Sequence, residues 1–175
     1  MKRTLLTLAA LALPALSQTT IKDAMIKHWK ATGELTLAVA KAMPAEDYNF
    51  RPNPEEMSFG QLMAHIAIAD RGACANASGM KAPDLTGAIA SFAKDNKQDV
   101  DKDSAVAFQT AVFDFCNQAV TAVTLEQLDK VVGPPNRNLT GYEWLWSYFT
   151  HTAHHRGQAE VYLRVKNIKP PTYVF

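Results

Sequence analysis

The sequence predicts an all-α protein, most simply an antiparallel four-helix bundle in a single domain. Four long segments carry apolar residues at three- and four-residue spacing, as the buried face of a helix requires. No segment shows an apolar–polar alternation long enough to predict a useful β-strand. The 175 residues are 47% hydrophobic and 20% charged, which provides enough apolar surface for one packed core.

The first long helix is expected over residues 21–43. Thr20 and Asp23 stand three positions apart, which is the spacing of a capping pair at a helix start. Pro44 ends the helix because proline cannot continue it. The proline-rich residues 44–56 then predict an extended connection.

The second long helix is expected to begin at Ser58, because Ser58 and Gln61 form a capping box. Gly79 is suited to end it, since glycine readily adopts the backbone conformation that follows a helix. Residues 81–102 are polar and less regular, and within them residues 86–94 predict a short helix.

The third and fourth long helices complete the predicted bundle. The third is expected over residues 103–123, and residues 124–132 predict a further short helical turn. Thr140 and Glu143 form another capping box, which opens a helix that continues to about Lys166.

The N-terminus predicts a signal peptide over residues 1–17, which leaves residues 18–175 as the folded domain. Lys2 and Arg3 precede a short apolar run and small residues suited to cleavage. The alternative is an N-terminal membrane anchor, but the run is shorter than the roughly 20 apolar residues that span a bilayer. We therefore expect an exported protein, periplasmic or extracellular, with no membrane contact after cleavage.

The overall charge excludes a nucleic-acid partner. The formal net charge is +1, and no helix carries a basic stripe with interleaved aromatic residues. Removing the signal peptide leaves 16 basic and 17 acidic side chains. The partners expected instead are a small-molecule substrate of unknown identity and a second copy of the chain in a homodimer.

The two cysteines, Cys74 and Cys116, are too few for a disulfide-rich scaffold or a cysteine zinc site. Each falls in a helical pattern, and the favoured interpretation is two small buried hydrophobic side chains. The alternative is a disulfide, which an oxidising compartment would permit.

Three of the five histidines lie close together in the fourth helix. His151 and His155 are four positions apart, so their rings lie on one face of the helix, whereas His154 points mostly away. This spacing allows two imidazoles to bind one metal ion. His65 lies at the margin of the apolar face of the second helix and could supply a third ligand, whereas His28 has no partner at a useful spacing. On spacing alone, ordinary core and surface histidines are favoured over a metal site.

Two motifs resemble the DinB/YfiT-like superfamily: residues 58–67, Ser-Phe-Gly-Gln-Leu-Met-Ala-His-Ile-Ala, and residues 151–158, His-Thr-Ala-His-His-Arg-Gly-Gln. The resemblance covers essentially the whole mature chain in order and spacing. It implies a four-helix bundle that holds a divalent metal cation, Zn or Ni in many members, between its helices. Carried over by position, the implied metal ligands are His65, His151 and His155.

Several neighbours of these histidines have two interpretations. Gln158 could hydrogen-bond a ligand or a water near the site, or could be a solvated residue. Arg156 could contact an anionic substrate, but an interhelical ion pair is favoured. We expect Gly157 to allow close helix packing, and Tyr148 and Tyr162 to pack in the core.

The resemblance implies a metal-dependent hydrolase or transferase of unknown substrate. Three neutral imidazoles leave a coordination position open, so the ion could lower the pKa of a water or hold a thiolate. Characterised relatives include bacillithiol transferases and a mycothiol-dependent maleylpyruvate isomerase. Their thiols are kept reduced in the cytoplasm, so export favours hydrolysis. The alternative is a metal-binding or stress-response module without catalysis.

Overall fold

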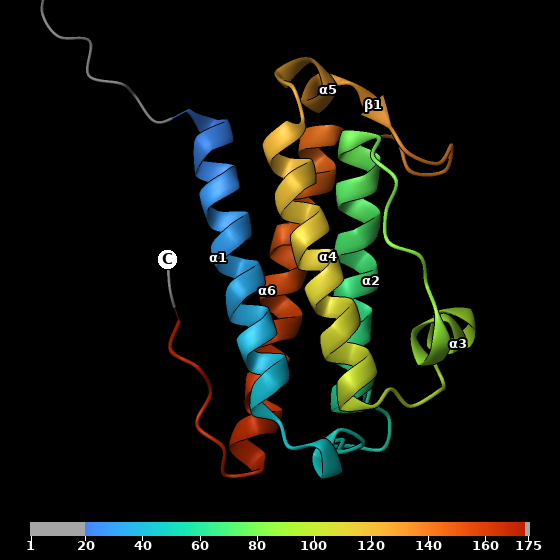
Figure 1. Cartoon of the computed structure of the whole chain (residues 1–175), viewed down its shortest axis with the longest axis vertical. Coiled ribbons are helices and arrows are strands. Elements are labelled where there is room, and N and C mark those ends of the chain that lie inside the picture. The colour runs from blue at the N-terminus through green and yellow to red at the C-terminus, as the bar shows by residue number, and fades with distance from the viewer. Residues whose placement is uncertain (1–19, 174–175) are drawn as a thin grey trace, which may run out of the picture.

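A computed structural model describes residues 20–173, so the predicted signal peptide lies outside the described residues. The predicted four-helix bundle is confirmed (Figure 1). Its long helices are α1 (Ile21–Ala42), α2 (Phe59–Ser78), α4 (Lys102–Ala122) and α6 (Gly141–Val165). The shorter elements are a 3-10 turn (Ala45–Asp47), α3 (Gly87–Asp95), α5 (Leu125–Asp129), β1 (Val131–Val132) and β2 (Leu139–Thr140).

The helices begin where the predicted caps place them. Capping boxes are present at Thr20 for α1, at Ser58 for α2 and at Thr140 for α6. The start of α4 differs slightly, because the side chain of Asp101 accepts a hydrogen bond from the backbone of Ser104. Each such cap satisfies a backbone N–H that the helix itself cannot, and contributes about 1 kcal/mol.

The long helices form a ring in which α2 and α1 each pack against both α4 and α6. α6 runs antiparallel to α2, and the Tyr162 hydroxyl near the end of α6 donates to the Met57 carbonyl just before α2 (3.1 Å). α2 and α4, in contrast, run in the same direction (Figure 1). The chain between them returns along the bundle through α3, so that Gln61 at the start of α2 donates to the Lys97 carbonyl shortly before α4 (3.0 Å). The simple antiparallel arrangement is therefore wrong for this pair.

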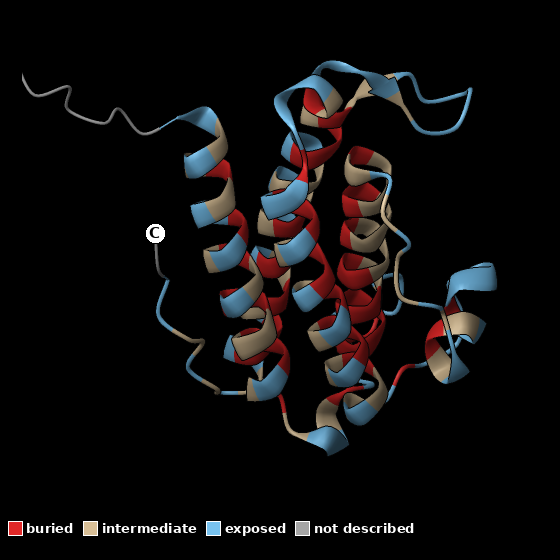
Figure 2. Cartoon of the chain, turned by 45° about the horizontal axis from the view of Figure 1, so that its top comes forward, coloured by how far each residue is buried: buried red, intermediate tan, exposed pale blue. Residues whose placement is uncertain are grey.

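The core lies between the four long helices (Figure 2). Most of the apolar residues expected to face the core are buried, and the largest departure is Ile21 at the start of α1, which is 68% exposed. Burial of each large apolar side chain stabilises the fold by about 1.5–3 kcal/mol. The largest fully buried apolar side chains are Val39, Met43, Tyr48, Phe59, Met63, Ile66, Phe92, Val100, Val112, Leu145 and Leu163.

Cys74 and Cys116 form a disulfide between α2 and α4, and their Cα atoms are 5.4 Å apart. The favoured expectation of two reduced cysteines is therefore wrong, although both residues are buried as expected. The reason is the parallel course of α2 and α4, which brings the two residues to the same height in the bundle.

β1 and β2 form a two-stranded antiparallel ribbon that the sequence does not predict. Val131 pairs with Thr140 and Val132 with Leu139, so each strand is too short to show an alternating pattern. The ribbon holds the loop of residues 133–138 beside the start of α6. Gly133 in this loop has a φ of +100°, and a Cβ atom there would lie 2.8 Å from the Trp144 ring.

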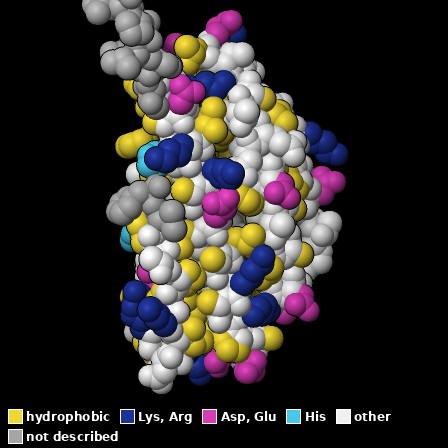
Figure 3. All heavy atoms as spheres, turned by 60° about the vertical axis from the view of Figure 1, so that its left-hand side comes forward, with side chains coloured by type: hydrophobic (Ala, Val, Ile, Leu, Met, Phe, Trp, Pro, Cys, Tyr) yellow, Lys and Arg dark blue, Asp and Glu magenta, His cyan; other side chains and the backbone are white. Residues whose placement is uncertain are grey.

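The surface agrees with the balanced composition. Charges of both signs are interspersed over the face that carries α1 (Figure 3). Among residues 20–173, no helix combines the length and the hydropathy needed to cross a bilayer.

Candidate metal centre

The structure brings together the three histidines that the resemblance implies as ligands. His65 comes from α2, and His151 and His155 come from successive turns of α6. One ring nitrogen of each lies within 4.8 Å of those of the others. The Nε2 atoms of His65 and His151 are 3.1 Å apart, and the His155 ring centroid is 4.7 Å from that of His65 and 4.4 Å from that of His151.

These distances fit a divalent metal ion. Two nitrogens that bind zinc tetrahedrally at 2.0–2.1 Å lie about 3.3 Å apart, close to the 3.1 Å between His65 and His151. The Nδ1 atom of His151 is buried without a hydrogen-bond partner in the described part of the chain, and an ion bound through Nε2 would leave it so. The three histidines are therefore close enough, and of the right chemistry, to hold a metal ion.

The environment lowers the pKa of two of the three rings, His65 and His151, which favours the neutral form that binds metal. Burial lowers the pKa of His151 to about 4, helped by the neighbouring His155, His65 and His154. Burial, and then the proximity of His155, also lowers the pKa of His65. Because like charges would crowd together if these rings were protonated, the cluster disfavours protons and favours a single shared cation.

Comparison with known proteins decides the family. The sequence profile of the DinB superfamily matches residues 28–159. This chain belongs to the DinB superfamily. No curated protein matches it.

Three solved structures share this DinB fold. A DinB-like protein of Bacillus cereus is 20% identical, with a TM-score of 0.70 over 90% of this chain and 99% of the other. A DinB-like protein of Bacillus subtilis is also 20% identical, with a TM-score of 0.67 and coverage of 86% and 96%. A conserved protein of Enterococcus faecalis is 17% identical, with a TM-score of 0.62 and coverage of 85% and 98%. At these identities the likeness shows the fold alone.

The other two histidines of this DinB protein lie outside the cluster. His154 is exposed on α6, as its place on the helix predicts, and only its ring edge approaches His155, at 4.8 Å between centroids. His28 is exposed on α1 and borders a different cavity.

Gln158 contacts the cluster directly. Its Oε1 atom lies 2.7 Å from Nδ1 of His155. With Nδ1 as the donor in this bond, Nε2 of His155 is left unprotonated and free to bind a cation. The bond also fixes the orientation of the ring.

Arg156 is buried on the side of α6 that faces α1. It is 3% exposed, and its guanidinium donates to the hydroxyl of Thr32 at 2.7 Å. None of its hydrogen bonds in the described part of the chain reaches the histidines. It thus joins α6 to α1 through a threonine rather than through the carboxylate of an ion pair.

Asp70 is a buried acid that the sequence analysis missed. It accepts a hydrogen bond from the Thr152 hydroxyl at 2.6 Å. Burial raises its pKa to about 7, against the opposing effects of the Thr152 bond and of Arg156. Its burial could have been predicted from helical spacing, because Asp70 lies four residues after the buried Ile66 and so falls on the apolar face of α2.

The remaining neighbours differ from expectation in two cases. Gly157 is exposed and a Cβ atom there would contact nothing, so its expected role in helix packing is wrong. Tyr162 packs in the core as expected, with 5% exposure. Tyr148 is only half-buried, and its ring centroid lies 5.4 Å from that of His151.

An open cavity of about 460 Å³ adjoins two of the three histidines. Tyr148 lines it, and Arg137 reaches it from the loop between β1 and β2. No acidic side chain lines it within the described part of the chain. The lining residues are His65, Ala69, Arg137, Leu139, Ser147, Tyr148 and His151.

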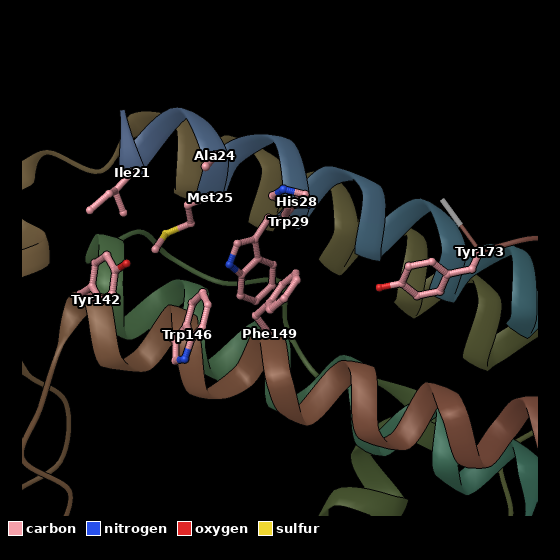
Figure 4. Close-up of a pocket in the computed structure, with 9 residues that line it drawn as sticks. All are labelled: Ile21, Ala24, Met25, His28, Trp29, Tyr142, Trp146, Phe149 and Tyr173. Carbon is pink, nitrogen blue, oxygen red and sulfur yellow. The ribbon is translucent and has the colours of Figure 1, made fainter. Parts of the chain in front are cut away.

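A second cavity, of about 400 Å³, lies between α1 and α6 (Figure 4). Trp29, Trp146 and Phe149 give it an aromatic wall, and it shares no lining residue with the cavity beside the histidines. The two cavities therefore lie against different faces of α6, and the chemistry of the histidine cluster belongs to the first.

Acidification should reduce the stability of this DinB protein through the histidine cluster. Because the folded chain lowers the pKa of His65 and His151 below 6.5, the unfolded chain binds more protons. The resulting stability is fully present above about pH 6.5 and falls as the pH drops toward about 4. A bound metal ion would lower the pKa of its ligands further. Between about pH 6.5 and 4.5, the melting temperature of metal-loaded protein should therefore fall by more than that of chelator-treated protein.

The two melting curves should converge at the acid end, where protons displace the metal. Circular dichroism melts at half-unit pH steps measure this directly. Parallel curves across the whole range would show that the histidines do not bind the added metal.

Proposed function

We propose that this protein binds one divalent metal ion, Zn or Ni, through His65, His151 and His155, and that it is a metal-dependent hydrolase or thiol transferase. The observation that carries the proposal is the convergence of three ring nitrogens within 4.8 Å beside an open cavity. Imidazole is a favourable ligand for both metals. Three protein ligands are the number found in catalytic zinc sites, which keep a further position for substrate.

The bound ion would supply Lewis-acid chemistry for the reaction of a small molecule in the cavity. The chain supplies orientation, because Gln158 holds the ring of His155. The hydroxyls of Ser147 and Tyr148 line the cavity and can donate hydrogen bonds to a substrate. Among the described residues that line the cavity there is no carboxylate to act as a general base.

Hydrolysis is the better-supported of the two reactions. The basic and apolar N-terminus supports export to the periplasm or the extracellular space, and the Cys74–Cys116 disulfide is a feature of proteins in oxidising compartments. Low-molecular-weight thiols are kept reduced in the cytoplasm, whereas hydrolysis needs only water.

Elemental analysis of the purified mature protein tests the metal, and about one divalent ion per chain is expected. A panel of esters, epoxides and thiol acceptors, assayed with and without chelator, then tests the reaction. Chelator-sensitive turnover supports the enzyme, and the class of substrate turned over distinguishes hydrolysis from transfer. Stoichiometric metal without any turnover would instead support the non-catalytic metal-binding or stress-response module.

A further inference from the structure

One cationic side chain, Arg137, lines the cavity beside His65 and His151. Arg137 belongs to the loop between β1 and β2, and its Nη1 atom donates to the Tyr148 hydroxyl at 2.5 Å. Its guanidinium carbon lies 5.4 Å from the Trp144 ring centroid and 6.0 Å from that of Tyr148. Arg137 is exposed, and its guanidinium lies against two aromatic rings of α6.

The loop that carries Arg137 is itself fixed in place. The backbone N–H of Arg137 donates to the Pro134 carbonyl at 2.9 Å. The Trp144 indole donates to the Val132 carbonyl at 3.0 Å, which joins β1 to α6. Because Tyr148 contacts both Arg137 and His151, the guanidinium has a defined position relative to the histidine cluster.

The charge of Arg137 is not neutralised within the described part of the chain. None of the ion pairs formed by residues 20–173 includes it. A guanidinium has five N–H donors, and the Tyr148 hydroxyl occupies only one side of this one. The others match the two oxygens of a carboxylate or a phosphate.

We propose that Arg137 binds an anionic group, a carboxylate or a phosphate, of a small molecule whose reacting group lies beside the three histidines. This inference rests on the proposed function and narrows its substrate class to small anionic molecules. A cavity of about 460 Å³ admits a ligand of that size. A metal ion and a guanidinium in one cavity without acidic residues both attract negative charge.

Isothermal titration of the metal-loaded protein tests the inference with succinate and butyrate, which have four carbons each and differ by one carboxylate. Succinate should bind at least about tenfold more tightly, since one carboxylate can bind the metal while the other pairs with Arg137. Arg137→Gln should remove this preference, and Arg137→Lys should retain part of it. Replacing succinate by 3-phosphonopropionate shows whether the subsite prefers a phosphate-like group.

Lys130→Gln is the matched control, because it removes a positive charge at the same end of the bundle but outside the cavity. It should leave the succinate preference unchanged. The inference is wrong if Arg137→Gln still prefers succinate to butyrate as strongly as wild type does. It is also wrong if Lys130→Gln reduces this preference as much as Arg137→Gln does. The metal content and melting temperature of each variant show that the site and the fold are intact.

A further comparison separates this inference from the proposed metal. In metal-free protein, butyrate should bind more tightly than the uncharged butyramide, and Arg137→Gln should abolish that difference. If wild-type protein holds no metal, the proposed function fails while this comparison still decides the role of Arg137. If the wild-type protein binds metal but butyrate binds no more tightly than butyramide, with or without metal, the proposed function stands and the proposed anion subsite is wrong.

Discussion

His155→Ala is expected to abolish metal binding, whereas His154→Ala should leave about one ion per chain. His155 lies in the cluster with its ring oriented by Gln158, and His154 is exposed outside it. Two remaining imidazoles hold zinc much more weakly than three. Metal content after gel filtration measures the difference directly.

The same pair of variants has a second readout in stability. A ligand that binds only the folded chain stabilises it by about 2.7 kcal/mol at a hundredfold excess over its dissociation constant. Added zinc should therefore raise the melting temperature of wild type and of His154→Ala, but not that of His155→Ala. Full metal occupancy in His155→Ala would show that the proposed ligand set is wrong.

Replacing both disulfide cysteines, Cys74→Ala with Cys116→Ala, should lower the free energy of unfolding by about 4 kcal/mol. The bridge joins residues 42 positions apart. Closing a loop of that length lowers the conformational entropy of the unfolded chain, which stabilises the folded state by about 4 kcal/mol. Urea denaturation monitored by circular dichroism gives the value. The variant should still fold with the same helix content, because the four apolar faces are unchanged.

Reductant provides the control for this comparison. Wild type should lose a similar amount of stability when its disulfide is reduced, while the double variant should not respond. Two thiols detected in denatured, unreduced wild type would contradict the bridge.

The local features of this fold could be predicted from the sequence. Helix starts depend on residues three positions apart, such as Ser58 and Gln61, and these pairs cap the helices as expected. The buried faces follow from helical periodicity, which is also local. The pairing of His151 with His155 needs only the geometry of one helix, and the family motif supplied His65.

The features that the sequence did not predict depend on contacts between distant segments. The disulfide requires α2 and α4 to run parallel, and nothing in either helix encodes that direction. The position of Arg137 depends on a ribbon of two-residue strands, too short to leave a pattern. Gly157 was misinterpreted for the same reason, because within the described residues a Cβ atom there would meet nothing within 4 Å.

α2 is the helix that takes part in both the disulfide and the proposed metal site. The disulfide links α2 to α4, and a metal ion held by His65, His151 and His155 would link α2 to α6. Three of the four long helices would then behave as one cross-linked unit. α1 contributes no histidine or cysteine to either link in the described part of the chain, and hydrogen bonds such as Arg156 to Thr32, together with apolar packing, hold it in place. Detachment of α1 is therefore the partial unfolding that would leave both cross-links intact, and a metal ion held by the three histidines would remain bound after the four-helix bundle had opened.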